Sequence, residues 1–303
     1  MTIRDARKKA IGMLTTKTPR LDVDVLLQYI SGHERSWILA HDDELIEKID
    51  LKNVFWSMVK KRSTGLPIAY IINHKEFYGY DFYVTPAVLI PKPDTELIVD
   101  RALDFIKNLS YSALNIADIC TGSGCIAISV VKNLIETMSF SKIDCYCTDI
   151  SDEALNIAKK NVELLLPQHC KKEQGEYNFH FLQGDLCKAI PSSAITGNFD
   201  VILSNPPYVP ASMTDKLLQD GRSEPRLALD GDAKKTSCDG TSIIRELIPQ
   251  VYERLKSGGV FFIETGEYNA AKTVTLLKEN GFINVENFCD MTGNPRVTCG
   301  FKI

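Results

Sequence analysis

An apolar run that breaks on two prolines is the stretch of this sequence with the clearest chemical meaning. The run at 200–204 is followed by Asn205, Pro206, Pro207 and Tyr208. Two successive prolines prevent both further ladder hydrogen bonds and the start of a helix, and the first keeps Asn205 out of the α region. The motif therefore predicts a rigid edge of carboxamide and carbonyl oxygens beside an aromatic ring. That edge suits a planar group with an NH2, either an amide or an adenine, and a proline-stiffened loop without a ligand is the plain alternative.

Three earlier apolar runs end in residues that could bind a nucleoside. Glycines after the first run let a ligand approach the backbone, and an acid after the second can accept hydrogen bonds from ribose hydroxyls. Each acid taken singly could be a turn or cap residue. In a doubly wound sheet, however, all four strand ends lie along one edge, which favours a nucleoside site. The residues are Thr121, Gly122, Ser123 and Gly124, then Asp149, then Gly184 and Asp185.

The elements that must position these residues alternate between strand and helix beyond residue 110. Such alternation predicts an α/β fold with a parallel sheet covered on both faces. Only residues 291–295 join the last two runs, 283–290 and 296–303, so these two must pair antiparallel, because a parallel pair needs a long crossover. We expect a mostly parallel seven-stranded sheet with one reversed strand near its edge. The other expected strands are 115–120, 142–150, 177–185, 199–205 and 259–264.

The N-terminal part of the chain has a different pattern. Helical periodicity through residue 65 predicts a small helical bundle. Short β-type runs at 70–72 and 80–84 predict a β-hairpin linker, and a helix is expected to begin near Asp94 or Thr95. The expected domains are 1–68 for the bundle, 69–90 for the linker and 91–303 for the α/β domain.

The composition is that of an ordinary globular protein. Of its 303 residues, 44% are hydrophobic and 24% charged, and the net charge of −4 disfavours stable binding to long nucleic acids. No stretch approaches the length of a membrane span, and no apolar segment follows the basic N-terminus, so we expect a cytoplasmic protein that does not enter membranes. The nine cysteines form no CxxC pair and the five histidines add no ligand spacing. We therefore expect reduced cysteines and no metal.

At this point the sequence resembles a known family. The four strand ends look like the successive motifs of class I S-adenosylmethionine-dependent methyltransferases, in the branch that methylates exocyclic or amide nitrogens. More narrowly, the chain resembles the HemK/PrmC family, whose members methylate the N5 nitrogen of a glutamine in peptide chain release factors. The stretches that carry the narrower resemblance, besides the N-terminal bundle, are 62–67 (Arg-Ser-Thr-Gly-Leu-Pro), 76–79 (Glu-Phe-Tyr-Gly), 89–96 (Leu-Ile-Pro-Lys-Pro-Asp-Thr-Glu) and 224–229 (Glu-Pro-Arg-Leu-Ala-Leu).

The resemblance implies a class I, Rossmann-like fold and roles for individual residues. The N-terminal domain would recognise the substrate, and the Gly122 to Gly124 turn would face the methionine portion of S-adenosyl-L-methionine. Catalysis would rest on placing the glutamine amide rather than on an obligatory base. The residues expected at the cofactor are Thr121, Gly122, Ser123, Gly124, Asp149, Ile150, Asp185, Leu186 and Asn205. Those expected to hold or methylate the substrate are Asn205, Pro206, Pro207, Tyr208, Glu224, Pro225 and Arg226.

The chain departs from the family pattern in two places and carries one long irregular segment. The family usually has Gly where Cys120 stands, which a strand conformation at Cys120 would tolerate. It usually has Arg-Pro-Glu where Lys92, Pro93 and Asp94 stand, and lysine keeps the charge but loses bidentate contacts. In the segment after Tyr208 we expect a substrate-gripping lid at 212–229 and disorder over 230–239.

The implied partner is a class I release factor, whose Gly-Gly-Gln loop carries the acceptor glutamine, and we expect a monomer. Two other substrates stay open on the sequence alone. One is a glutamine of a ribosomal protein, and the other is the N6 nitrogen of adenine in nucleic acid, since the Asn-Pro-Pro-Tyr motif is shared with DNA adenine methyltransferases. The last would need base flipping into a basic cleft. A third possibility is a catalytically idle module that docks on the translation machinery.

Overall fold

A computed structural model describes the chain except for residues 51, 111–112, 139, 167–174, 192–198 and 220–223. The described residues form two compact units. Met1–His74 belongs to the first unit, whereas Lys75–Lys216 and Glu224–Ile303 form the second. Among the described residues, no helix combines the length and the apolar character needed to cross a lipid bilayer.

The first unit is the predicted helical bundle. Its helices are α1 (Ile3–Met13), α2 (Pro19–Ser31), α3 (Arg35–Ala40), α4 (Val54–Ser63) and α5 (Ile68–Ile72). The apolar faces of α1, α2 and α4 meet in a core that includes Ile3, Leu26 and Phe55, all fully buried. The sequence analysis missed α3, because a helix of six residues is too short to show a period. The last apolar run of the N-terminal helical periodicity, 51–59, begins at Leu51, which lies outside the described residues.

The prediction of a strand at residues 70–72, as the first strand of the hairpin, is wrong. Residues 70–72 lie in α5, which follows Pro67 and ends at Asn73 in the left-handed region. A short apolar run does not distinguish a strand from a buried helical turn, and this run is helical. The hairpin itself exists but is formed by β1 (Lys75–Phe77) and β2 (Tyr80–Phe82). Its turn residues, Tyr78 and Gly79, both have positive φ, as a tight two-residue hairpin turn requires.

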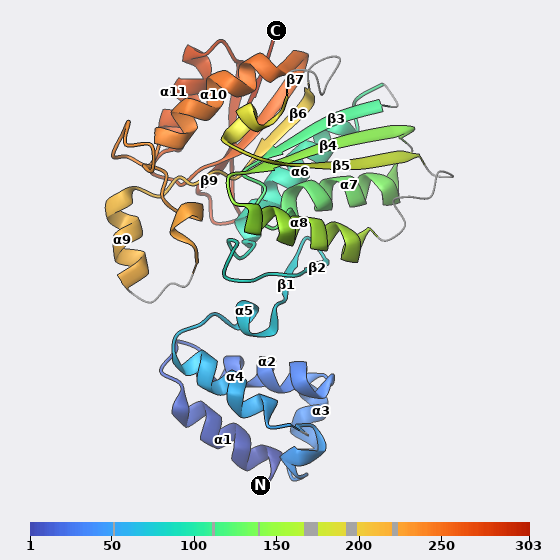
Figure 1. Cartoon of the computed structure of the whole chain (residues 1–303), viewed down its shortest axis with the longest axis vertical. Helices are drawn as coiled ribbons and strands as arrows, with labels where there is room; N and C mark the ends of the chain where they lie inside the picture. The colour runs from blue at the N-terminus through green and yellow to red at the C-terminus, as the bar shows by residue number, and fades with distance from the viewer. Residues whose placement is uncertain (51, 111–112, 139, 167–174, 192–198, 220–223) are drawn as a thin grey trace. The chain divides into compact units, whose positions relative to one another are not determined.

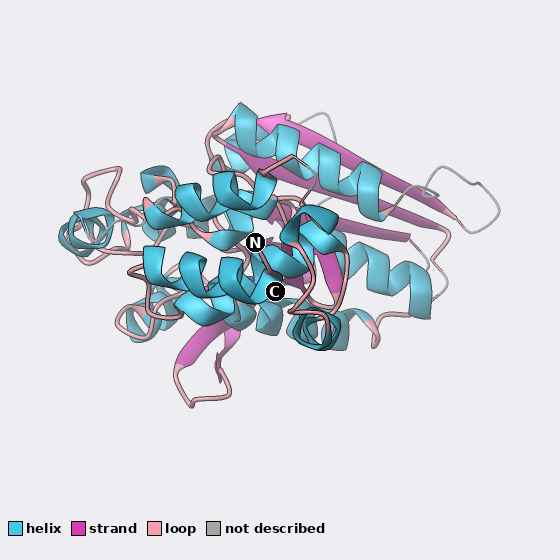
Figure 2. Ribbon diagram, turned by 90° about the horizontal axis from the view of Figure 1, so that it is seen from below, coloured by secondary structure: helices cyan, strands magenta, loops and turns pink. Residues whose placement is uncertain are grey.

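The second unit contains the predicted seven-stranded sheet, in the order β5-β4-β3-β6-β7-β9-β8. Only β9 runs opposite to its neighbours, one position from the edge, and this prediction is confirmed. The sheet crosses the upper part of Figure 1, and Figure 2 shows helices packed along it. The strands are β3 (Ala113–Ile119), β4 (Lys142–Asp149), β5 (Glu176–Gln183), β6 (Phe199–Ser204), β7 (Leu255–Glu264), β8 (Ile283–Cys289) and β9 (Pro295–Phe301).

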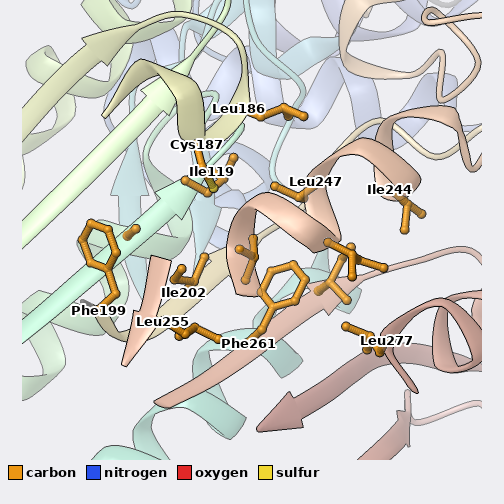
Figure 3. Close-up of a cluster of buried hydrophobic side chains, with 14 of the residues drawn as sticks. Ile119, Leu186, Cys187, Phe199, Ile202, Ile244, Leu247, Leu255, Phe261 and Leu277 are labelled. Atoms are coloured by element: carbon orange, nitrogen blue, oxygen red, sulfur yellow. The ribbon is translucent and has the colours of Figure 1, made fainter. Parts of the chain in front are cut away.

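Helices cover both faces of this sheet. α6 (Glu96–Ile106), α7 (Cys125–Thr137) and α8 (Asp152–Leu165) pack side by side on one face, and α10 (Ser242–Arg254) and α11 (Ala270–Glu279) cover the other (Figure 1). Figure 3 shows the core beneath α10, where Leu247 belongs to the same buried cluster as Ile202 and Phe261 of the central strands. Burial of such side chains contributes about 1.5–3 kcal/mol each, which holds the strand ends in fixed positions.

The segment after Tyr208 is more ordered than expected. α9 (Ala211–Gln219) follows the motif, and the prediction of disorder over 230–239 is wrong. The Asp232 carboxylate is buried there and accepts hydrogen bonds from the Gly240 N–H (2.9 Å), the Ser237 hydroxyl (2.8 Å) and the Ala211 N–H (3.2 Å). A buried acid thus ties together a stretch whose composition alone indicates a loop. The expected lid at 212–229 includes residues 220–223, which lie outside the described part.

Candidate active site

A cavity of about 500 Å³ opens where β3, β4, β5 and β6 end. Because parallel strands end at the same edge of a sheet, residues distant in sequence meet there. Of the predicted residues, the cavity walls include Thr121, Gly122, Ser123, Asp149, Ile150, Asp185, Leu186, Asn205, Pro207 and Pro225. Gly124, Pro206, Tyr208, Glu224 and Arg226 do not line it.

The turn after β3 brings backbone up to the cavity. Gly124 precedes α7 with φ of 78°, in the left-handed region that favours glycine. Cys120 has φ of 62°, so the expectation that it keeps a strand conformation is wrong. The left-handed region costs a non-glycine residue about 1–2 kcal/mol, which explains why glycine suits this position.

The Asp149 carboxylate joins the turns after β3 and β4. Its two oxygens accept hydrogen bonds from the Gly122 N–H and the Ser151 N–H, both at 2.9 Å. Burial raises the pKa of Asp149, and backbone hydrogen bonds from Ser151 and Gly122 oppose that rise. An acceptor for hydroxyl groups is thereby held at the cavity wall, close to the N-terminus of α7.

Asp185, after β5, sits in a cluster of alternating charges. Its carboxylate contacts Lys234 Nζ at 2.9 Å and Lys188 Nζ at 3.3 Å. Burial raises the pKa of Asp185, but the hydrogen bonds from these lysines outweigh it and lower the pKa overall. Both lysines also contact Glu246 of α10, so the charges at this end of the cavity are balanced.

Asn205 and Tyr208 are anchored by side chains from other elements. The Asn205 Nδ2 amide donates to Thr95 Oγ1 at 3.2 Å, and the Tyr208 hydroxyl donates to Glu264 Oε1 at 3.0 Å. Thr95 and Glu264 are both 2% exposed. Burial raises the pKa of Glu264 to about 7, against hydrogen bonds from Thr95 and Tyr208 that favour the carboxylate. Burial and the nearby Glu264 charge raise the pKa of Tyr208 as well.

Glu224 and Arg226, expected at the substrate, bind other protein groups in this structure. Glu224 is buried, and its carboxylate contacts Lys92 Nζ at 2.6 Å. Lys92 thus keeps a structural contact although it lacks the two-pronged geometry of arginine. Arg226 lies between Asp215 and Asp230, with 3.0 Å between Nη2 and the Asp230 carboxylate. Of Glu224, Pro225 and Arg226, only Pro225 lines the cavity.

The sequence analysis assigned no site role to several polar side chains at or next to the cavity, among them Lys92, Thr95, Glu264 and Lys234. Lys92 and Thr95 lie in the stretch 89–96 that carried the family resemblance, but no role was assigned to Thr95. Glu264 closes β7 next to β6, so the strand-end argument that found Asp149 could have found it. Lys234 lies in the segment expected to be disordered, and no sequence signal indicates its position.

Comparisons with known proteins agree with this geometry. A family model described as the PrmC N-terminal domain matches residues 5–72, and one described as a methyltransferase domain matches residues 110–295. A release factor glutamine methyltransferase of Koribacter versatilis is 34% identical, covering 100% of this chain and 99% of that protein. One of Coxiella burnetii is 35% identical and covers 98% of each chain. The chain belongs to the release factor glutamine methyltransferase family.

The sheet and its helices are those of methyltransferases that act on other substrates too. A 16S ribosomal RNA N2 methyltransferase of T. thermophilus, solved in complex with AdoMet and guanosine, has a TM-score of 0.52 at 16% identity. The match covers 76% of this chain and 50% of that one, and at this identity it shows a shared fold alone. The predicted class I, Rossmann-like fold and the family resemblance are both confirmed.

Proposed function

We propose that this protein transfers the methyl group of S-adenosyl-L-methionine to the side-chain amide nitrogen of the glutamine in the Gly-Gly-Gln motif of class I release factors. The observation that carries the proposal is the anchored Asn205 carboxamide at the wall of a nucleoside-sized cavity. Similarity along the full chain to release factor glutamine methyltransferases supports it.

We propose that polar groups at the cavity wall bind S-adenosyl-L-methionine. The turn at Gly122 presents backbone next to the N-terminus of α7, which suits the methionine carboxylate. We propose that Asp149 holds the ribose hydroxyls, and that Asp185 with the neighbouring Ile150 and Leu186 borders the adenine. When bound, the cofactor supplies a methyl group on a positively charged sulfonium.

Asn205 and the backbone after it would orient the acceptor. The Nδ2 amide of Asn205 is engaged by Thr95, so Oδ1 is the atom left to accept a hydrogen bond. We propose that Asn205 Oδ1 and the Pro206 carbonyl accept the two N–H bonds of the glutamine amide, with Pro207 keeping the backbone rigid and Tyr208 against the amide plane. Held by both hydrogens, the amide nitrogen can pyramidalise as it bonds to the methyl carbon. The carbon–sulfur bond would break to leave a neutral thioether, and the surplus N–H proton would pass to water, because a protonated amide nitrogen is strongly acidic. A well-placed reactant can gain about 7–11 kcal/mol from orientation, which makes a general base dispensable.

The experiment uses the purified full chain, a release factor and S-adenosylmethionine with a labelled methyl group. Label is expected on the Gly-Gly-Gln glutamine, and Asn205→Ala is expected to slow transfer by about 10²-fold or more because the acceptor loses its orientation. A release factor in which that glutamine is replaced by alanine serves as the substrate control. No label on the glutamine, with label on DNA offered in parallel, would contradict the proposal and favour adenine-N6 methylation.

Substrate recognition, assembly state and location belong to the same proposal. We propose that the helical domain 1–68 recognises the release factor, that the linker 69–90 connects it, and that 91–303 binds the cofactor. We propose that the protein is cytoplasmic, where its cysteines would stay reduced. Of the stretch 224–226, Pro225 is proposed to contact substrate at the cavity, with Glu224 and Arg226 holding it there through their contacts with Lys92 and Asp230. The expected monomer stays a prediction, which light scattering of the purified chain can check.

A further inference from the structure

Asn161 of α8 does not line the cavity, yet its side chain binds two of the segments that form the cavity wall. We infer that Asn161 is a positioning residue for S-adenosyl-L-methionine, because it ties the segment 83–92 to the turn at Ser123. The inference rests on the proposed placement of the cofactor in this cavity. It does not depend on which substrate receives the methyl group.

The segment 83–92 supplies one wall of the cavity. It runs from the end of β2 to the helical turn η2 (Pro93–Thr95), and its residues, all of them described, belong to neither helix nor strand. Because the segment is not part of the sheet, its position must be fixed by contacts outside the strand ladder. Its apolar residues that line the cavity are Pro86, Ala87, Val88, Leu89 and Pro91.

Asn161 takes the place of a neighbouring strand at the start of this segment. Its Oδ1 accepts a hydrogen bond from the Tyr83 N–H at 2.7 Å, and its Nδ2 donates to the Tyr83 carbonyl at 3.0 Å. Two such bonds to one residue are what a paired antiparallel strand supplies. Nδ2 also donates to the Ser123 carbonyl at 2.8 Å, so both of its hydrogens are used. One carboxamide therefore joins the start of the wall segment to the cofactor turn.

The carboxamide of Asn161 has only one favourable orientation. The Tyr83 N–H requires an acceptor, whereas the Tyr83 and Ser123 carbonyls require donors. A carboxamide turned by 180° would direct its own oxygen at two carbonyl oxygens. Asn161 is fully buried, so water does not replace a lost hydrogen bond without rearrangement. Asn161 thereby fixes the distance between Tyr83 and the turn.

The helix that carries Asn161 packs on both segments. α8 contacts β2 and α7, which it adjoins in Figure 1. Ala158 lies one helical turn before Asn161, and a Cβ placed at Gly124 would lie 3.2 Å from the Ala158 Cβ. Lys160 Nζ lies 3.2 Å from the centre of the Tyr83 ring. Because α8 is close to the turn and to Tyr83, Asn161 can bind both without strain in its backbone.

The first test measures S-adenosylmethionine binding to the full chain by calorimetry. Asn161→Ala leaves the Tyr83 N–H and two carbonyls without their partner, so the wall segment and the turn can separate. We expect the Kd to rise by about tenfold or more. Asn161→Asp keeps the shape and the acceptor but loses both donors, and it should bind as weakly. The matched control is Asn156→Ala on the exposed side of α8, where Nδ2 donates to Asp152 at 3.1 Å. Its Kd should stay within about threefold of wild type.

A second control separates positioning from a general loss of stability. Leu277 is fully buried in α11, on the other face of the sheet, and does not line the cavity. Leu277→Ala should lower the stability of the fold and leave the Kd within about threefold of wild type, at a temperature where every variant is folded. Hydrogen–deuterium exchange should be faster at 83–92 and 121–124 in Asn161→Ala, and not selectively there in Leu277→Ala.

A measurement on the wild-type chain decides the question even if the Asn161 variants do not fold. Without cofactor, the Tyr83 amide hydrogen should exchange slowly although Tyr83 lies beyond the end of β2, because Asn161 accepts it. S-adenosylmethionine should slow exchange at 83–92 and 121–124 together. Rapid exchange at Tyr83, or a Kd of Asn161→Ala within threefold of wild type, would overturn the inference. If the wild-type chain does not bind S-adenosylmethionine, the proposed placement of the cofactor fails instead, so the two failures are distinct.

Discussion

At the scale of single residues, the site depends on side chains held in one orientation by buried neighbours. Asn205 and Tyr208 are fixed by Thr95 and Glu264, so the motif does not act as an isolated tetrapeptide. Asp149 is likewise fixed, because it accepts two backbone N–H groups at 2.9 Å. Pre-organised groups of this kind lose little freedom when the substrate binds, which is the condition for catalysis by placement.

Cys120 allows a prediction about backbone strain beside the cofactor cavity. Its φ of 62° lies in the left-handed region, where a Cβ is costly and glycine is not. We expect Cys120→Gly to be more stable than Cys120→Ala by about 1 kcal/mol in the free energy of unfolding, measured in urea. The comparison uses alanine because both variants lose the sulfur. Equal stability of the two variants would show that the turn relaxes without strain.

At the scale of elements, the segment 230–240 is the least expected part of the fold. It packs against the backbone of the Asn-Pro-Pro-Tyr motif, with Val209 and Asp230 joined by a parallel bridge. The Tyr208 carbonyl accepts a hydrogen bond from Asn269 Nδ2 at 2.9 Å on another side. The Asn-Pro-Pro-Tyr motif is therefore held in place by the segment 230–240 and by Asn269, as well as by its own prolines.

A substitution at Gly231 can test how far the segment 230–240 holds the motif in place. A Cβ at Gly231 would lie 2.2 Å from the Gly240 carbonyl oxygen and 2.7 Å from Tyr208 Cα, both backbone atoms that cannot move aside. We expect Gly231→Ala to lose about 1–3 kcal/mol of stability and to lower kcat, because the strain displaces Tyr208. The control is Gly12→Ala in α1, where the added methyl meets no atom within 4 Å. That change should be neutral or stabilise by about 0.5–1 kcal/mol, as measured by thermal and urea unfolding.

At the scale of the whole molecule, the cavity of the candidate active site and the helical bundle belong to two separate compact units, each with its own core. Every residue that lines the cavity lies in the second unit, between Lys75 and Ile303. The core of the first unit, around Leu26 and Phe55, shares no residue with the core beneath α10. Such a division allows the two proposed roles, cofactor binding and substrate recognition, to be tested separately.

Removal of residues 1–74 should therefore separate two activities. We expect residues 75–303 to bind S-adenosylmethionine within about threefold of the full chain, because no cavity residue is lost. Methylation of a release factor should fall by about tenfold or more, since the proposed recognition surface is gone. Calorimetry measures the first quantity and the labelled-methyl assay the second. If the truncated chain methylated the release factor as fast as the full chain, the bundle would have no part in substrate recognition.

Much of the architecture could be predicted from the sequence because it depends on local patterns. Alternating strands and helices determined the α/β class, and the short join at 291–295 required an antiparallel pair in the sheet. The short run at 70–72 was mispredicted, since an isolated apolar triplet fits a helix and a strand equally. The ordered segment 230–240 was missed because its stability comes from the buried Asp232, and burial is set by the rest of the fold.

The sequence by itself determined that a proline-rigid motif, glycines and acids at four strand ends converge on one edge of a sheet. The sequence determines this convergence because strand direction and strand order depend on connection lengths and hydrophobic periodicity. Both can be read from short stretches of the sequence. Only the tertiary structure decided that Thr95 and Glu264 lie behind Asn205 and Tyr208, and that Lys92 pairs with Glu224. These contacts join residues more than 50 positions apart, and hydrogen-bond direction depends on distances that no local pattern encodes.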